Sequence, residues 1–175
     1  MIQVRIETEL GEILVLLDDA HAPATVANFL RYVDGEFYNG GRFHRTVTMG
    51  NQPNDAVRIE VVQAGVNPAR DAERFVPLAL ERTTMTGLRH RDGTISMARF
   101  TPDSAVSDFF ICIGDQPSLD FGGARNPDGQ GFAAFGQVIQ GMNVVRAIQM
   151  APAEGQTLTP PIAIRRVTRE TEASA

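Results

Sequence analysis

The stretch Ser107-Asp108-Phe109-Phe110-Ile111-Cys112-Ile113 begins with two polar residues and continues as a run of five apolar ones. A segment rich in glycine follows it. A run of this length beside turn-forming residues predicts a strand in the core of a sheet. Adjacent residues of a strand face opposite sides, so Phe109 and Phe110 are expected on opposite faces. The centre of the chain is therefore expected to be β-structure.

Short strand patterns recur on both sides of this run. Residues 2–7 alternate between apolar and polar side chains, as in a half-buried strand. Residues 13–17 are continuously apolar, as expected of a strand covered on both faces. Further strands are predicted at residues 42–47, 57–63, 93–98, 132–139 and 162–168, with loops at 49–56 and 114–131.

Two helices are predicted, one near each end of the chain. The first is predicted to begin at Pro23 and to end at Asp34-Gly35. Proline lacks a backbone N–H, and this costs nothing in the first turn of a helix, where the N–H groups have no partner within the helix. The second covers residues 141–150. The first helix carries an apolar stripe at helical spacing, made of Val26, Phe29, Leu30 and Val33.

These elements favour one architecture over the others. About eight short strands and two helices, without regular alternation, argue for an antiparallel barrel with helices at its ends rather than a doubly wound parallel sheet. The 175 residues suit one domain with one core. We expect that domain at residues 1–170 and a frayed tail at residues 171–175.

The composition argues against several classes of function. A net charge of −5 does not suit a general nucleic-acid binder, which needs a basic surface. No apolar stretch approaches the length of a membrane span, and the strand pattern starts at residue 2, where a signal peptide would lie. The chain as given is expected in the cytoplasm, or in the periplasm if a leader has been removed.

Disulfide and metal chemistry have little support. Cys112 is the single cysteine, so it forms no internal disulfide and cannot anchor a cysteine-rich zinc site. Within its apolar run it is expected to be a small buried hydrophobic residue. The three histidines show no spacing typical of metal ligands.

Five short motifs follow one another along the chain. They are FHR at 43–45, VQAG at 62–65, GTISMA at 93–98, SDFFI at 107–111, and FGQV at 135–138 with Gly141-Met142. Their order and spacing resemble the cyclophilin family of peptidyl-prolyl cis-trans isomerases. The segment APATVANF at 22–29 is also similar to the first helix of the family. Each motif alone is weak, but five in order are specific, and the resemblance covers residues 2–168.

The resemblance implies a mainly β fold, a closed eight-stranded antiparallel β-barrel capped by two α-helices. It also implies isomerase activity without a cofactor, at a groove on the outside of the barrel. The expected partners are proline-containing peptides and unfolded or partly folded proteins, and not nucleic acid or membranes. We expect a monomer, because no amphipathic stretch is left without a core to pack on.

The reaction explains why an arginine is sought at the site. Rotation about an Xaa-Pro bond loses amide resonance, with an uncatalysed barrier of about 18–20 kcal/mol. In the twisted state the imide nitrogen regains a lone pair, to which a fixed guanidinium can donate a hydrogen bond. The resemblance gives this catalytic role to Arg45. Arginine suits it better than lysine, because its fork is planar and always charged.

The resemblance also assigns the groove that holds the substrate. Phe110 would form the floor of the proline pocket, and Gln63 would hold the substrate carbonyl near the arginine. Phe132 stands where relatives carry a histidine or another aromatic ring. The strand edge at residues 98–99 would pair with the substrate backbone. The substrate-binding residues implied are Val61, Gln63, Ala98, Arg99, Asp108, Phe110, Leu119 and Phe132.

The segment before Gln63 departs from the family pattern. Counting back from Gln63, the usual pocket phenylalanine falls at Glu60 and the usual methionine at Val61. An unpaired carboxylate in an apolar pocket is costly. The segment 46–62 is also longer than usual, so either its loop supplies other pocket residues or Glu60 points outward beside a shifted strand.

Three further positions also depart from the pattern. Asp108 stands where a glutamine is usual and Arg99 where an asparagine is usual, so we expect an ion pair between them across the groove. Ser118 replaces the tryptophan that helps to hold the drug cyclosporin in relatives. Weak cyclosporin binding is therefore expected.

Two other functions compete with isomerisation. The same groove can bind prolyl peptides without turning them over. A hydrolase has less support, because there is no Gly-x-Ser-x-Gly motif and Ser96, Ser104 and Ser107 lack a convincing histidine partner. His44 and His90 suggest a general base, but isomerisation needs none, so a structural role is expected for both.

Overall fold

Eight antiparallel strands close into a barrel. The computed structural model describes residues 1–170, and the tail expected at 171–175 lies outside that range. Around the barrel the strands follow the order β1 (Ile2–Thr8), β2 (Gly11–Leu17), β7 (Ala134–Gln140), β5 (Thr94–Met97), β6 (Phe109–Cys112), β4 (Val61–Gly65), β3 (Arg42–Val47) and β9 (Thr157–Arg169), and β9 pairs back with β1. The two-residue β8 (Ala153–Glu154) pairs with β9 alone.

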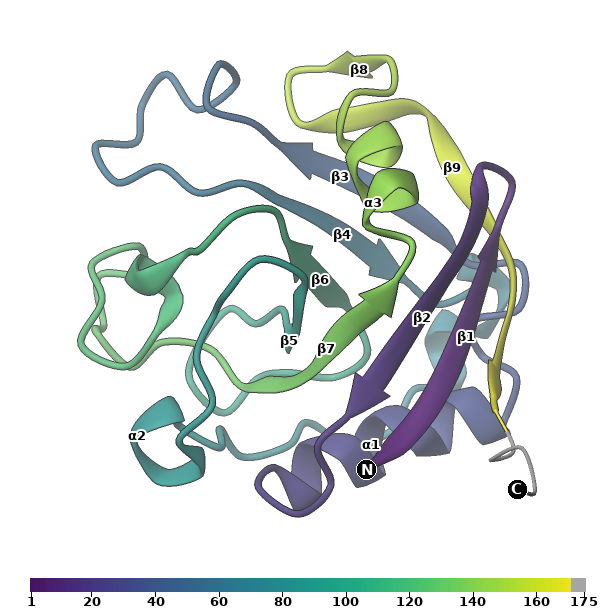
Figure 1. Ribbon diagram of the computed structural model, residues 1–175, viewed down its shortest axis with the longest axis horizontal. Helices are drawn as coiled ribbons and strands as arrows, with labels where there is room; N and C mark the ends of the chain where they lie inside the picture. Colours follow the sequence, from purple (N-terminus) through teal and green to yellow (C-terminus); the bar gives the residue numbers. More distant parts are fainter. Residues whose placement is uncertain (171–175) are drawn as a thin grey trace.

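Two helices close the ends of the barrel. In Figure 1, α1 (Pro23–Asp34) lies across the lower end and α3 (Met142–Gln149) across the upper end. Between them the chain adds the single-turn α2 (Thr83–Thr86) and the short 3-10 helices η1 (Pro68–Glu73) and η2 (Pro117–Leu119). The prediction of a mainly β fold, an eight-stranded barrel capped by two helices, is confirmed, and the predicted bounds of the first helix are those observed.

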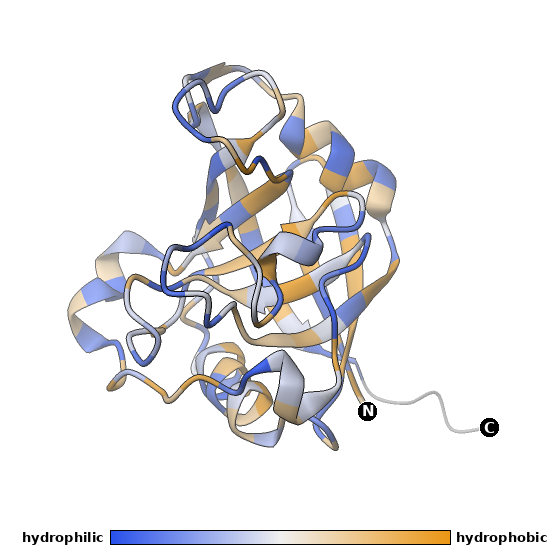
Figure 2. Cartoon of the chain, turned by 90° about the vertical axis from the view of Figure 1, so that its left-hand side faces the viewer, coloured by the Kyte–Doolittle hydropathy of each residue, from blue (hydrophilic) through white to orange (hydrophobic). Residues whose placement is uncertain are grey.

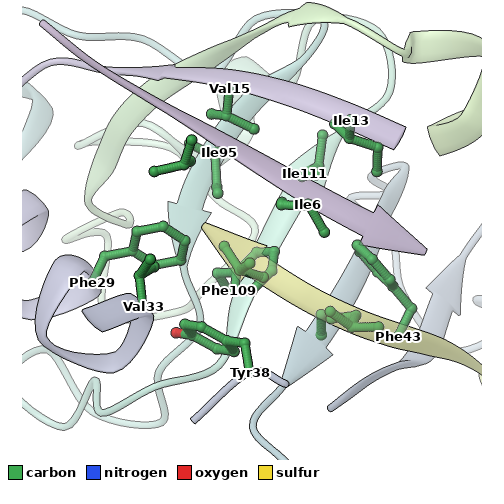
Figure 3. Close-up of a cluster of buried hydrophobic side chains, with 14 of the residues drawn as sticks. Ile6, Ile13, Val15, Phe29, Val33, Tyr38, Phe43, Ile95, Phe109 and Ile111 are labelled. Atoms are coloured by element: carbon green, nitrogen blue, oxygen red, sulfur yellow. The ribbon is translucent and has the colours of Figure 1, made fainter. Parts of the chain in front are cut away.

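The core fills the barrel interior with alternate residues of each strand and with one face of α1. Apolar and polar residues alternate along the strands in Figure 2. Phe29 of α1 meets the rings of Tyr38, Phe109 and Phe135 at centroid distances of 5.3–5.5 Å. Figure 3 shows Phe29 and Val33 beside Phe109. Phe109 belongs to this core, whereas Phe110 belongs to a separate outer cluster, so the opposite orientation predicted for the two rings is confirmed.

Three strand predictions need correction. Residues 13–17 are not covered on both faces, because Leu14 and Leu16 are only half-buried. Residues 57–60 are not a strand, since the Ile59 amide donates to the Gln52 side chain instead of a neighbouring strand. The last strand starts at Thr157 rather than after the two prolines.

The prolines at 160–161 are tolerated inside β9 because of an irregularity in its pairing with β3. Phe43 pairs with Ile162, but Arg45 pairs with Thr157, so residues 158–161 bulge out of this ladder. Proline lacks a backbone N–H and is tolerated in a strand where no ladder bond is required. The strand therefore continues through the two prolines, which lie outside the strand predicted at residues 162–168.

Truncation of Phe109 tests the importance of the aromatic core. We expect Phe109→Ala to lower the free energy of unfolding by about 3–5 kcal/mol, because it leaves a cavity among packed rings. Urea denaturation measures the change. The control Val76→Ala alters a side chain that is 80% exposed and is expected to stay within about 0.5 kcal/mol of the parent protein. Equal effects of the two substitutions would contradict this description of the core.

Candidate active site

A β-bulge in β3 turns Arg45 toward the outside of the barrel. Phe43 pairs with Ala64 of β4 and Arg45 pairs with Gln63, so His44 is an extra residue on β3. Phe43 packs in the core, while His44 is partly exposed and Arg45 lines a surface cavity. In a regular strand, Arg45 would share the inward face of Phe43, two residues away. The bulge places two successive side chains on the outer face.

Strand pairing then aligns the key side chains on that face. Gln63 of β4 lies opposite Arg45 on one side and Phe110 of β6 on the other. Phe110 in turn lies opposite Ser96 of β5. A row of side chains therefore crosses four neighbouring strands, although its members are far apart in the sequence.

Arg45 is held by two neutral amides. Its Nη1 donates to Gln63 Oε1 at 3.0 Å, and its Nε donates to Gln156 Oε1 at 2.9 Å. No carboxylate within residues 1–170 forms an ion pair with this guanidinium. Burial away from water, with a smaller effect of nearby Arg125, lowers the pKa of Arg45 below its ordinary value. The side chain still carries its charge near neutral pH, because arginine stays protonated in proteins.

An apolar notch lies beside the guanidinium. Phe110 packs in a buried cluster with the side chains of Val47, Ile59, Val61, Cys112 and Leu119. Ala98 and Phe132 pack against this cluster. The rings of Phe110 and Phe132 meet edge to face, with their centroids 5.7 Å apart. The notch belongs to a cavity of about 530 Å³ that also contains Arg45. Cys112 is buried as expected, and burial raises the pKa of its thiol.

All nine residues assigned to catalysis and substrate binding line this one cavity. They are Arg45, Val61, Gln63, Ala98, Arg99, Asp108, Phe110, Leu119 and Phe132. Glu60, which stands at the position of the usual pocket phenylalanine, is not among the lining residues, whereas its neighbour Ile59 is. The half-buried Glu60 contributes its backbone carbonyl, which accepts from the Ile113 amide.

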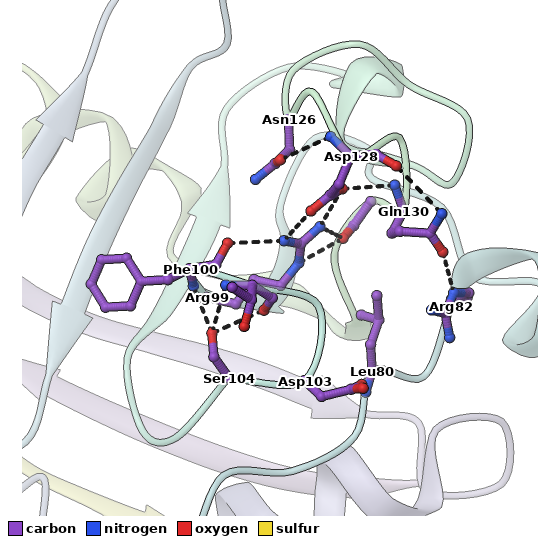
Figure 4. A network of polar contacts seen from close by, with 11 residues as sticks. Leu80, Arg82, Arg99, Phe100, Asp103, Ser104, Asn126, Asp128 and Gln130 are labelled. Carbon is purple, nitrogen blue, oxygen red and sulfur yellow. Dashed lines mark hydrogen bonds and ion pairs between the residues drawn. The ribbon is translucent and has the colours of Figure 1, made fainter.

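The expected ion pair between Arg99 and Asp108 is wrong. The Arg99 side chain is 1% exposed and binds Asp128 through both terminal nitrogens, at 2.9 and 3.0 Å (Figure 4). Its guanidinium also lies 4.6 Å from the centre of the Phe132 ring. Arg99 therefore fixes the wall of the notch to the following loop. Asp108 instead contacts His44 Nε2 at 2.9 Å and accepts from Gln63 Nε2 at 3.1 Å.

The cavity is also lined by residues that the sequence did not predict. Arg125 donates to Gln52 Oε1 and to the carbonyl of Val57, which fastens the long segment after β3 to the loop after β6. No local pattern links positions that lie 73 residues apart. The unusual length of the segment 46–62 was the feature of the sequence that pointed to additional pocket residues, and Ile59 of this segment does line the cavity. The lining residues that were missed are Ile59, Arg74, Phe100, Ser104, Val106, Ser107, Arg125 and Asn126.

Ser96 does have a histidine partner, contrary to expectation. Its Oγ lies 2.8 Å from His90 Nε2, and His90 Nδ1 lies 2.7 Å from Asp120 Oδ1. This is the order of groups in a serine hydrolase. However, Ser96 is 0% exposed and His90 is 1% exposed. The Phe110 ring also stacks on the imidazole of His90, with the two ring centroids 6.0 Å apart. A substrate carbonyl has no access to this serine, so the three groups support the floor of the notch.

The described residues hold neither a metal-binding cluster nor a membrane-spanning helix. No group of three or more histidine, cysteine, aspartate or glutamate side chains within residues 1–170 is arranged to hold a metal ion. No helix in the same range is long and apolar enough to cross a bilayer. The candidate site combines an arginine, amides, an acid–imidazole pair and an apolar notch.

Comparison with known proteins identifies the family. The family model described as "Cyclophilin type peptidyl-prolyl cis-trans isomerase/CLD" matches residues 3–169. Peptidyl-prolyl cis-trans isomerase A of Dickeya dadantii is 36% identical over 152 residues, which cover 86% of this chain and 73% of that protein. The isomerase cyp18 of Streptomyces antibioticus is 36% identical over 151 residues, covering 85% of this chain and 84% of the relative.

Solved structures agree on the fold. A cyclophilin-type isomerase of Cryptosporidium parvum superposes with a TM-score of 0.74 at 20% identity, covering 99% of this chain and 100% of the other. A structure of that protein in the presence of the dipeptide Ala-Pro gives a TM-score of 0.73 at 20% identity, covering 97% and 99% of the two chains. With a barrel of this form and a family match over nearly its whole length, the chain belongs to the cyclophilin-type peptidyl-prolyl cis-trans isomerase family.

Proposed function

We propose that the protein accelerates cis-trans rotation of Xaa-Pro bonds by seating the proline ring against Phe110 and donating a hydrogen bond from Arg45. One observation carries the proposal. A guanidinium without a carboxylate partner lies at the rim of an apolar notch, in the same cavity. The apolar walls suit the proline ring, and the guanidinium suits the imide nitrogen when it becomes pyramidal.

The arrangement favours the twisted state over the planar one. A planar imide nitrogen shares its lone pair with the carbonyl and is a poor acceptor, whereas the twisted nitrogen accepts a hydrogen bond. The Arg45 donor therefore binds the transition state more strongly than the ground state, as catalysis requires. A thousandfold acceleration needs about 4 kcal/mol of such differential binding, which one charged donor in a poorly hydrated site can supply.

Gln63 and Asp108 orient the donor. The Gln63 amide nitrogen donates to Asp108, which fixes the amide so that its oxygen faces Arg45 Nη1. His44 contacts the same Asp108 oxygen. Gln63 keeps a second N–H that can reach a substrate carbonyl. In this proposal His44 transfers no proton, because the reaction makes and breaks no bond to hydrogen.

The substrates we propose are proline-containing segments of peptides and of unfolded or partly folded proteins. The Cryptosporidium parvum structure in the presence of Ala-Pro supports a prolyl ligand for this fold. The cavity of about 530 Å³ has room for residues beside the proline. We also propose that the protein acts as a monomer.

A non-catalytic prolyl-peptide binder on the same groove is the alternative. It would show chemical-shift changes with a prolyl peptide in NMR spectra but no increase in the isomerisation rate. Exchange spectroscopy on a peptide with a slowly rotating Xaa-Pro bond measures both properties in one sample. The uncompensated charge of Arg45 favours the enzyme, because simple binding of an apolar ring does not need it.

Removal of the guanidinium gives the most direct test. We expect Arg45→Ala to lower kcat/KM by about 10²–10³-fold, with a much smaller change in peptide affinity, because the donor acts mainly in the transition state. A protease-free isomerisation assay and NMR titration measure the two effects. Arg45→Lys is also expected to be impaired, since an ammonium lacks the planar fork. Turnover of Arg45→Ala at the parent rate, with folding intact, would contradict the proposal.

The pH profile separates this mechanism from acid–base catalysis. Burial lowers the pKa of Arg45, but arginine stays protonated in proteins, so the guanidinium is expected to keep its charge over the range tested. We expect kcat/KM to change by less than about twofold between pH 6 and pH 9, measured by NMR exchange. A bell-shaped profile with a tenfold change would instead indicate a general acid or base.

Cyclosporin binding tests the departure at Ser118. A serine there offers neither the ring surface nor the indole N–H of tryptophan, and Ser118 is not among the residues that line the cavity. We expect a dissociation constant in the micromolar range or weaker, measured by calorimetry. Ser118→Trp is expected to tighten binding. Nanomolar binding by the unmodified protein would refute this expectation.

A further inference from the structure

The second amide that holds Arg45 comes from a turn on the opposite side of β3. Gln156 lies in the two-residue turn between β8 and β9, where Gly155 has a φ of 60°. Its Oε1 accepts from Arg45 Nε at 2.9 Å, and its backbone carbonyl accepts from the amide of Thr46, the next residue of β3. The turn therefore contacts both the side chain and the strand that carries it.

This turn is tied to the long loop that follows β3. Asn51 donates through Nδ2 to the carbonyls of Thr46 and Gly155, at 2.9 and 3.2 Å. Its side-chain oxygen accepts from the Thr48 amide at 2.8 Å, and its backbone carbonyl accepts from Gln156 Nε2 at 3.3 Å. Asn51 thus joins the loop, the end of β3 and the turn in one hydrogen-bonded unit.

The loop is itself fixed at its other side. Gln52 is 1% exposed, and its Nε2 donates to the carbonyls of Thr48 and Ile59 at 2.6 and 2.7 Å. Its Oε1 accepts from the Ile59 amide and from Arg125. A side chain so buried and so fully bonded indicates a loop with a defined conformation, which can carry a positional constraint.

We propose that Gln156 is a positioning residue for the catalytic guanidinium, held in place by the long loop through Asn51. The inference rests on the proposed function of Arg45. With Nε bound to Gln156 and Nη1 bound to Gln63, the guanidinium plane is fixed from two sides. Nη2 is left as the guanidinium nitrogen without a hydrogen bond to residues 1–170, so its N–H groups are available to the substrate.

Both groups that bind the Arg45 guanidinium are amide oxygens rather than carboxylates. An amide oxygen orients an N–H donor without neutralising the charge behind it, whereas a carboxylate would form an ion pair with the guanidinium. Two amides therefore give Arg45 a fixed direction and leave its charge for the reaction. A misplacement of about 1 Å of a reacting group can cost up to about 10²-fold in rate, so loss of one amide is expected to be measurable.

Two substitutions at Gln156 test the inference. Gln156→Ala removes the acceptor, and Gln156→Met removes it while keeping the length of the side chain. We expect both to lower kcat by about tenfold with KM changed less than about twofold, and to shift the Arg45 Nε–Hε resonance in NMR spectra. The thermal unfolding midpoint is expected to stay near that of the parent protein. The control Gln140→Ala changes an exposed glutamine at the end of β7 and should leave all three quantities unchanged.

A second pair of variants tests the role of the loop. Asn51→Ala should lower kcat in the same direction by a smaller factor. Its effect should not add to that of Gln156→Ala, because both substitutions act on one contact. Asn54→Ala is the matched control, since Asn54 lies exposed in the same loop. Additive effects of Asn51→Ala and Gln156→Ala would overturn the proposed link through the loop.

Three outcomes would overturn the role of Gln156. They are an Nε–Hε resonance unmoved by both variants, a moved resonance with unchanged kcat, and a fall in kcat that only follows loss of folded protein. The Arg45→Ala variant is measured beside them. If it turns over at the parent rate, the proposed function itself fails. An inactive Arg45→Ala beside fully active Gln156 variants would defeat the positioning role alone.

Discussion

The site depends on one irregularity in the backbone. The extra residue at His44 turns Arg45 out of the barrel while Phe43 stays in its core. A regular strand would direct the guanidinium into a packed apolar interior, where burial of an unpaired charge is prohibitively costly. Once the bulge is formed, regular pairing of β4, β6 and β5 places Gln63, Phe110 and Ser96 in one row with Arg45.

The site also shows how surroundings decide what a group can do. Ser96, His90 and Asp120 have the connectivity of a hydrolytic triad, yet they lie under the Phe110 ring and out of reach of a substrate. Arg99 and Arg45 are both arginines of the same cavity, but the first is paired with Asp128 and the second is not. The two arginines differ in their partners and not in their type, and the catalytic role proposed for Arg45 rests on that difference.

The sequence predicted those features that depend on short-range patterns. Alternation and apolar spacing predicted most of the strands, the first helix and the opposite faces of Phe109 and Phe110, and the ordered motifs predicted nine residues that line one cavity. Contacts between distant loops were out of reach. Nothing in the sequence pairs Arg99 with Asp128, Ser96 with His90, or Arg45 with Gln156, because the barrel brings these side chains together only after folding.

Closure of the barrel has a consequence for the exposed edges of the sheet. Each of its eight main strands has a neighbour on both sides, and within residues 1–170 the two-residue β8 is the strand with one side unpaired. Open edges are templates on which sticky segments add as new strands and start aggregates. Because so little of the sheet edge is open, the fold leaves few places where the unfolded chains proposed as substrates could add as an extra strand.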